Sequence, residues 1–202
     1  MYIGSGDISA LLAGINTKAQ QHLLRRFVSD EIPYYNAKAS PIDALRTGAI
    51  LEERYFLLLP DNYFPQFKVV CDIKDVLKAS IDFAKIENSK IVDFEELKTA
   101  NLMDYLDIED AHRNGNLDFI KKKYKNNYNQ VQEQLLCSGL DEASLVFLAV
   151  YSYEDDVNYT RNIQESEYVK FRIKRDEQVI NTILERAEIY QTIKNYYEPR
   201  RL

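Results

Sequence analysis

The chain has 202 residues, of which 46% are hydrophobic and 29% charged, and its formal net charge is −6. This length suits one domain spanning residues 1–202 with a substantial core, and the composition is that of an ordinary globular protein. The acidic balance disfavours a protein that coats nucleic acid non-specifically, but it is compatible with an enzyme that holds DNA through a local basic surface.

The cysteines and the apolar runs bear on the compartment. Cys71 and Cys137 are the only cysteines, and two alone provide no disulfide framework, which favours a reduced, cytoplasmic protein. The N-terminus lacks the basic and apolar regions of a signal peptide. The most apolar run, 145–151, is far shorter than the ~20 residues that a membrane span requires. We therefore expect a cytoplasmic protein that has no membrane partner.

Helices are predicted throughout the first 59 residues. The third of them begins at Ser40-Pro41, a capping serine followed by a proline suited to the first helical position. Steps of three and four residues place Glu52 on its inward stripe, together with Leu45, Gly48 or Ala49, and Tyr55 or Phe56. The predicted helices cover residues 8–14, 18–29 and 41–59.

The middle of the chain is a predicted β-hairpin with charges on its inward face. Two apolar-rich runs flank the polar connection 87–90. Because side chains alternate along a strand, Glu96 and Lys98 share a face with Phe94, while Asp82 lies in the facing strand. Buried charges are costly unless they pair or bind a metal. The strands cover 79–86 and 91–99, after a first strand at 67–72.

The remaining elements complete a mixed α/β protein. Helical patterns follow the hairpin, and the segment that contains Gln130 and Gln132 ends at Ser138-Gly139, a helix stop signal. Two strands and a long helix beginning at Asp176 close the chain. We expect a mixed sheet flanked by helices. These later elements are helices at 102–111, 117–125 and 128–136, and strands at 145–153 and 168–174.

Polar residues within otherwise core-like runs suggest a metal site. Three carboxylates converging in a dry site raise one another's pKa unless a cation neutralises them. Hard oxygen ligands suit Mg²⁺ or Mn²⁺, and the Leu97 carbonyl is a further candidate oxygen. Lys98, beside such a metal, is placed to orient or deprotonate the attacking water. The candidate residues are Glu52, Asp82, Glu96, Leu97, Lys98, Gln130 and Gln132.

The hairpin motif resembles the core of the PD-(D/E)XK nuclease superfamily. Asp82 corresponds to the aspartate of that motif, with Ile81 in place of its proline, and Glu96-Leu97-Lys98 corresponds to the ExK segment. The resemblance implies a restriction-endonuclease-like core in which Asp82, Glu96 and the Leu97 carbonyl hold metal and Lys98 activates water.

Three further segments are similar to the YqaJ/phage lambda exonuclease branch of that superfamily, in the order that the branch has them. They are the opening IGSGDISALLAG, the helix segment LRTGAILEE with Gly48 and Glu52, and YNQVQEQLLCSG with Gln130 and Gln132. By this resemblance Glu52 assists metal binding, with two ions in the site, and Gln130 and Gln132 support the site or contact the scissile phosphate.

The same resemblance implies an activity and partners. We expect a Mg²⁺- or Mn²⁺-dependent 5′→3′ exodeoxyribonuclease that resects double-stranded DNA ends for phage-type recombination. It would leave a 3′ single strand for an annealing protein, in a bacterial or phage-infected cell. Members of the branch are often ring-shaped homotrimers that thread DNA, which would reconcile the acidic net charge with DNA binding.

Basic residues offer candidate DNA contacts. Arg25 and Arg26 lie in the second helix, and Lys121, Lys122 and Lys123 form a run near the glutamine helix. Such runs are also typical of solvated faces.

Other interpretations remain at this stage. Glu96 and Lys98 are compatible with an ordinary surface ion pair. A restriction-type endonuclease shares the motif, as does a RecB-like repair nuclease, although the latter typically carries four cysteines. A catalytically silent DNA-end-binding protein with the same fold is the non-enzyme alternative.

Overall fold

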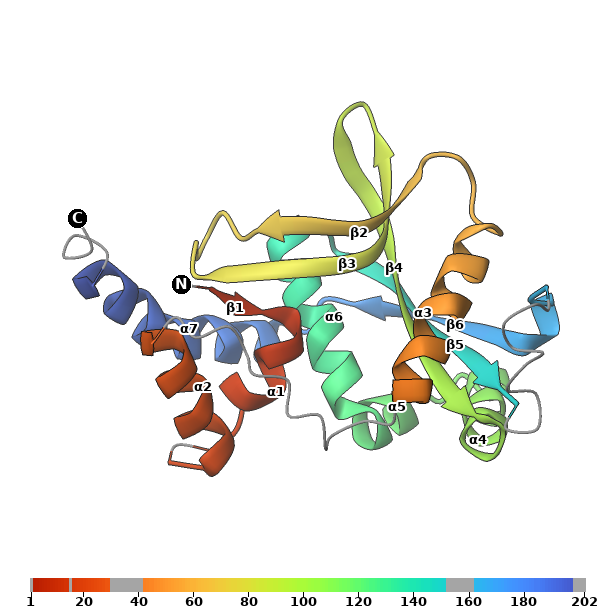
Figure 1. Ribbon diagram of the computed structural model, residues 1–202, viewed down its shortest axis with the longest axis horizontal. Helices are drawn as coiled ribbons and strands as arrows, with labels where there is room; N and C mark the ends of the chain where they lie inside the picture. The colour runs from red at the N-terminus through yellow and green to blue at the C-terminus, as the bar shows by residue number, and fades with distance from the viewer. Residues whose placement is uncertain (1, 15, 30–41, 152–161, 198–202) are drawn as a thin grey trace.

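A computed structural model describes residues 2–14, 16–29, 42–151 and 162–197, and it shows a mixed six-stranded sheet with helices packed against it (Figure 1). The strands follow the order β1-β3-β4-β5-β6, and β2 pairs with β3 outside this path. Pairing is parallel for β1–β3 and β4–β5, and antiparallel for β2–β3, β3–β4 and β5–β6. The strands are β1 (Ile3–Gly4), β2 (Tyr63–Val70), β3 (Leu77–Glu87), β4 (Lys90–Asn101), β5 (Glu142–Val150) and β6 (Tyr168–Lys174).

The helices cover the sheet unequally. Only α3 contributes to the apolar cluster on one face, where Leu51 and Tyr55 pack on Phe83 and Val146. The other clusters bring together the remaining helices with β1, β3, β4, β5 and β6. The helices are α1 (Ile8–Leu11), α2 (Lys18–Ser29), α3 (Ile42–Phe56), α4 (Leu102–Arg113), α5 (Leu117–Lys123), α6 (Lys125–Ser138) and α7 (Glu177–Tyr197), with 3-10 turns η1 (Ser5–Asp7) and η2 (Glu165–Glu167).

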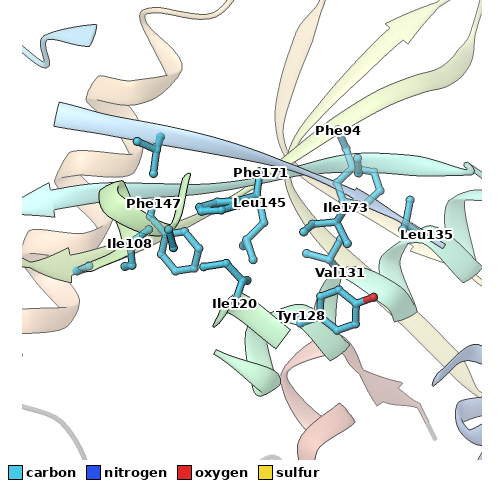
Figure 2. Packing of buried hydrophobic residues seen from close by; sticks show 14 of the residues in the cluster. Phe94, Ile108, Ile120, Tyr128, Val131, Leu135, Leu145, Phe147, Phe171 and Ile173 are labelled. Carbon is cyan, nitrogen blue, oxygen red and sulfur yellow. The ribbon is translucent and has the colours of Figure 1, made fainter. Parts of the chain in front are cut away.

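Helix α6 lies against the sheet through a continuous apolar stripe. Figure 2 shows Tyr128, Val131 and Leu135 of this helix beside Phe94 and Ile173 of the sheet. All five side chains are buried. The helix ends at Gly139, whose φ of 72° is the left-handed conformation that glycine adopts without strain. This packing fixes the rotation of α6, and therefore which of its polar side chains face β4.

Most of the expected elements are present, with shifted ends. The hairpin strands extend beyond the predicted limits, and the segment 102–111 forms one helix with the two residues after it. Asp176 caps α7 by accepting a hydrogen bond from the Val179 amide at 3.4 Å. Strand β1 was not predicted, because two residues are too few for a periodic pattern. Within the described residues, no helix combines the length and apolarity needed to cross a membrane.

The inward stripe of α3 differs from the sequence prediction. The buried positions are Thr47, Leu51 and Tyr55, four residues apart, whereas Ala49 is exposed and Glu52 is half-buried. The side chain of Leu45 lies outside the described residues. Glu52 therefore sits at the edge of the stripe, because one residue along a helix turns the side chain by roughly 100°.

Candidate active site

The site is built where β3 and β4 separate. The antiparallel pairing of β3 with β4 starts at the hairpin turn and ends with the pair Phe83 and Glu95. Just beyond it, the Asp82 carboxylate takes the place of a strand partner and accepts a hydrogen bond from the Leu97 amide at 2.9 Å. The amide and the carbonyl of one strand residue point to the same edge, so the Leu97 carbonyl also faces the Asp82 side. The point where β3 and β4 separate, called the fork below, thus brings together the Asp82 carboxylate and the Leu97 carbonyl oxygen.

Glu96 is the buried centre of this site. Its side chain is 0% exposed, and three side chains donate hydrogen bonds to it. The Lys98 ammonium and the Gln130 amide both reach Oε1 at 2.5 Å, and the Gln134 amide reaches Oε2 at 2.6 Å. Gln134 also donates to the Ser80 carbonyl at 2.8 Å, which links α6 to β3. The carboxylate is therefore held in one orientation from two elements.

The helical period explains which glutamines reach Glu96. Residues four apart share a helix face, so Gln130 and Gln134 point toward β4 together. Gln132 points away: its amide donates to the Lys174 carbonyl at 2.9 Å and its oxygen accepts from the Asp176 amide at 2.7 Å. The structure corrects the sequence-based placement of Gln132, which joins the end of β6 to the start of α7 instead.

Sequence reasoning missed Gln134. The detectable signal was the i, i+4 spacing from Gln130, but the Q-x-Q pattern directed attention to a period of two. It also missed Gln66 of β2, whose amide donates a hydrogen bond to Glu52 Oε1. No pattern within β2 indicated that contact, because it depends on the tertiary placement of α3.

Glu52 approaches the cluster from α3. Burial raises its pKa, the Gln66 hydrogen bond opposes that rise, and the Glu96 carboxylate adds to it. Glu52 also lines a groove of about 830 Å³ between α3 and the β2–β3 pair. Glu52 is therefore close enough to Glu96 for their charges to interact, and it lies between the site and this groove.

The Glu96 carboxylate disfavours the ionisation of Asp82 and of Glu52. Burial, followed by the Glu96 charge, raises the pKa of Asp82 to about 8, with Lys98 opposing and Glu52 contributing. Burial alone would lower the pKa of Lys98, but the charges of Glu96 and Asp82 outweigh it and hold the pKa above its ordinary value. One ammonium is thus shared among three carboxylates, an excess of negative charge that a cation would relieve.

The donor chemistry fits a hard divalent metal. Asp82, Glu96 and the Leu97 carbonyl provide oxygen ligands of the kind that Mg²⁺ and Mn²⁺ prefer, and Glu52 lies at the margin. In the part of the chain that the structure describes, no three acidic, histidine or cysteine side chains already form a metal cage. Lys98 and Gln130 occupy Glu96 Oε1 instead, so a metal would compete with these two donors.

A second buried carboxylate lies on the opposite face of β4. Glu95 is 4% exposed and accepts hydrogen bonds from the Tyr55 hydroxyl at 2.6 Å and from the Lys170 ammonium at 2.7 Å. The same ammonium lies 5.6 Å from the ring centroids of both Tyr55 and Tyr168. This cluster ties α3 to β4 and β6 immediately behind the site.

The candidate DNA-contact residues lie on two separate helices, and several of them are paired. Arg26 of α2 forms an ion pair with Asp7, while Arg25 is exposed. On α5, Lys121 lies 3.5 Å from Asp176, and Lys122 is exposed. Lys123 pairs with Asp104 at 2.9 Å and with Asp107 at 3.0 Å. The structure does not bring the two groups into one cluster.

Comparisons with known proteins support the fold assignment. No protein-family model matches the chain, and no curated protein matches it significantly. Among solved structures, a phage-related exonuclease from Haemophilus somnus 129PT aligns with a TM-score of 0.65 and 14% identity, covering 100% of this chain and 97% of that one. The alkaline exonuclease LHK-Exo from Laribacter hongkongensis aligns with a TM-score of 0.62 and 15% identity, covering 99% and 91%. The expected mixed α/β fold, with helices flanking a central sheet, is confirmed.

Proposed function

We propose that the chain is a metal-dependent deoxyribonuclease that degrades linear double-stranded DNA from its 5′ ends. The observation that carries this proposal is the Asp82–Glu96–Lys98 arrangement at the fork of β3 and β4. Two structures of the same fold are described as exonucleases, which supports the reaction class. An acidic cluster with one fixed lysine is the chemistry that phosphodiester hydrolysis with Mg²⁺ requires.

Each side chain then has a role. Asp82, Glu96 and the Leu97 carbonyl would hold Mg²⁺ or Mn²⁺, with Glu52 toward a second ion. When bound, such ions lower the pKa of a water ligand and neutralise charge on the phosphate. Gln130 and Gln134 keep the Glu96 carboxylate oriented. Gln132 braces α7 and takes no part in the chemistry.

Lys98 acts as a charged donor. Because Glu96 and Asp82 hold its pKa above the ordinary value, it stays protonated at neutral pH and does not serve as the general base. Its side chain is 27% exposed while its ammonium is anchored to Glu96. In this position it orients the attacking water and stabilises charge on the phosphate in the transition state.

The expected partners and assembly belong to the same proposal. The product would be a 3′ single strand suited to an annealing protein in recombination. A homotrimer with a central channel would place Arg25, Arg26 and Lys121–Lys123 against DNA while leaving the exterior acidic. A single-strand-annealing partner and the trimer rest on the resemblance of the sequence motifs, and sedimentation in solution tests the latter.

The test uses linear duplexes labelled at either end and a closed circular duplex. We expect Mg²⁺-dependent release of mononucleotides from the 5′ strand of the linear DNA, none in EDTA, and no cutting of the circle. Asp82→Ala and Lys98→Ala should be inactive. Cutting of the circle would assign an endonuclease instead, and full activity of Lys98→Ala would overturn the mechanism. DNA-end binding without hydrolysis by the wild type would identify a silent end-binding protein.

A further inference from the structure

The groove beside Glu52 has walls unlike those of the carboxylate site. Phe56 at the end of α3 and Leu57 just after it line a space of about 830 Å³ together with Pro65 and Phe83. Leu57, which is 79% exposed, adds an accessible apolar side chain to this wall. The volume falls in the range of about 300–1,000 Å³ typical of sites for small organic groups. Glu52 lines this space and is also a candidate residue of the active site, so the groove borders that site.

We propose that this groove binds the unstacked terminal nucleobase of the DNA strand whose backbone lies at Asp82 and Glu96. The inference rests on the proposed nuclease function and names a subsite for that same substrate. It assigns the base of the nucleotide being released, rather than a phosphate or a protein side chain, as the occupant.

The charges along the groove favour a neutral occupant. Its charged lining residues are Glu52, Glu53 and Arg54, so carboxylates outnumber the guanidinium. A phosphodiester brought into this space would meet net repulsion, whereas a nucleobase carries no charge at neutral pH. The backbone is therefore directed to the fork, where a cation offsets the carboxylates, and the base is directed to the groove.

The half-buried Phe56 ring provides a stacking surface, and the fully buried Phe83 ring supports it from behind. The Phe56 and Phe83 rings are parallel within 8°, and their centroids lie 5.9 Å apart. Phe56 is only half-buried, so its ring edge or face borders the groove as well as the core. Stacking of bases on aromatic side chains is tolerant of sequence, as an exonuclease working through any DNA requires.

The test compares duplexes whose 5′-terminal nucleotide carries either a base or an abasic tetrahydrofuran. Wild-type enzyme should release the base-bearing nucleotide with a kcat/KM about 5-fold or more above that of the abasic one, as expected for one stacked base. Phe56→Leu, which keeps an apolar side chain but removes the ring, should bring this ratio close to one. Met103→Ser, at a 74% exposed position on α4, is the control and should keep the wild-type ratio.

A second measurement separates this inference from the proposed function. Fluorescent 2-aminopurine deoxyriboside, which has no phosphate, is titrated in EDTA against the wild type, Leu57→Ser and Phe56→Leu. Saturable quenching by the wild type that weakens several-fold in both variants supports the groove even if no hydrolysis is found. Equal quenching in all three proteins, or a base preference that survives Phe56→Leu, overturns the inference. An absence of hydrolysis alone would reject only the nuclease proposal.

Discussion

Glu95 and Glu96 are successive residues of β4 whose side chains lie on opposite faces of the sheet, and the two faces differ in their balance of charge. Both carboxylates are nearly inaccessible, and each pairs with a lysine and with neutral donors. On the Glu95 face, the Tyr55 hydroxyl and the Lys170 ammonium donate to the carboxylate, and the ammonium lies 5.6 Å from the ring centroids of Tyr55 and Tyr168. The charge of Glu95 is thus balanced by one cation, Lys170, and we call this the closed face.

The Glu96 face has an excess of negative charge. Asp82 and Glu52 add two carboxylates to the single Lys98 cation, and the pKa of Asp82 rises to about 8 as burial and these neighbours act together. Burial and a lysine partner therefore do not by themselves distinguish a functional carboxylate from a structural one. The distinguishing feature is a surplus of anionic groups facing an accessible space, which structural clusters rarely retain.

The largest expected effect is the difference in nuclease activity between the Glu96→Gln and Glu95→Gln variants. Glu96→Gln should lower nucleotide release by at least about 1,000-fold, since it removes a metal ligand and the anchor of Lys98. Glu95→Gln should stay within about 3-fold of wild type, because Glu95 only supports the scaffold. Initial rates on linear duplex in Mg²⁺ measure both, with circular dichroism confirming that each variant is folded. Comparable losses in the two variants would erase the distinction between the faces.

A third buried carboxylate shows what happens without a cation. Glu133 is 0% exposed, and its Oε2 has no hydrogen-bond partner among the described residues. Burial raises its pKa to about 8, while the Cys137 thiol, 3.3 Å away, opposes the rise. The native state therefore holds this proton more tightly than the unfolded chain, and the stability that protonation provides is lost as pH rises from about 5 through about 8.

Glu133→Gln should remove that dependence. Its Tm should match that of the wild type near pH 5 and exceed it at pH 8.5 by about 4–8 °C, as expected for about 2 kcal/mol in a chain of this size. Differential scanning calorimetry across the pH range measures the difference, with Glu177→Gln as a surface control. A Tm difference that is the same at both pH values would mean that Glu133 does not titrate in this window.

The glutamines of α6 sharpen the comparison within one helix. Gln134→Leu should reduce kcat about 10-fold, because Glu96 loses a donor and its orientation, an effect of about 1.4 kcal/mol. Gln132→Leu should leave kcat nearly unchanged and lower stability instead, since its partners are the Lys174 carbonyl and the Asp176 amide. Steady-state kinetics and urea unfolding of both variants test this. The reverse assignment of effects would restore Gln132 to the site.

The smallest expected effect concerns the closed face. Tyr55→Phe removes the 2.6 Å hydrogen bond to Glu95 but keeps the ring against Phe83 and Tyr168. We expect a loss of about 1 kcal/mol in the free energy of unfolding and a change in kcat of less than about 2-fold. Urea denaturation and kinetics measure the two quantities. A large fall in kcat with little loss of stability would show that this face also serves catalysis.

The order of the elements and the shared face of Glu96 and Lys98 could be predicted from the sequence because both depend on local periodicity. Alternation along β4 placed Glu96 and Lys98 on one face, and the structure shows them in contact at 2.5 Å. The opposite role of Glu95 was not predicted, because its partners come from α3 and β6, elements far apart in the chain.

The incorrect predictions at the site also concern side chains whose partners lie far away in the sequence. Gln132 was assigned to the site from the resemblance of YNQVQEQLLCSG to a Q-x-Q motif, whereas the helical period brings Gln130 and Gln134 to Glu96. The pairing of Arg26, Lys121 and Lys123 with acidic residues was also invisible, since long side chains choose partners only after the elements have packed. Residue type and spacing therefore located the carboxylates, and tertiary structure decided their donors.

The most direct test of the central claim is calorimetric titration of Mn²⁺ into the wild type, Asp82→Asn and Glu95→Gln at neutral pH. The account predicts saturable binding to the wild type and to Glu95→Gln, and at least about 10-fold weaker binding to Asp82→Asn. Equal binding by all three proteins, or none by the wild type, would contradict the assignment of the Glu96 face as a metal-dependent site.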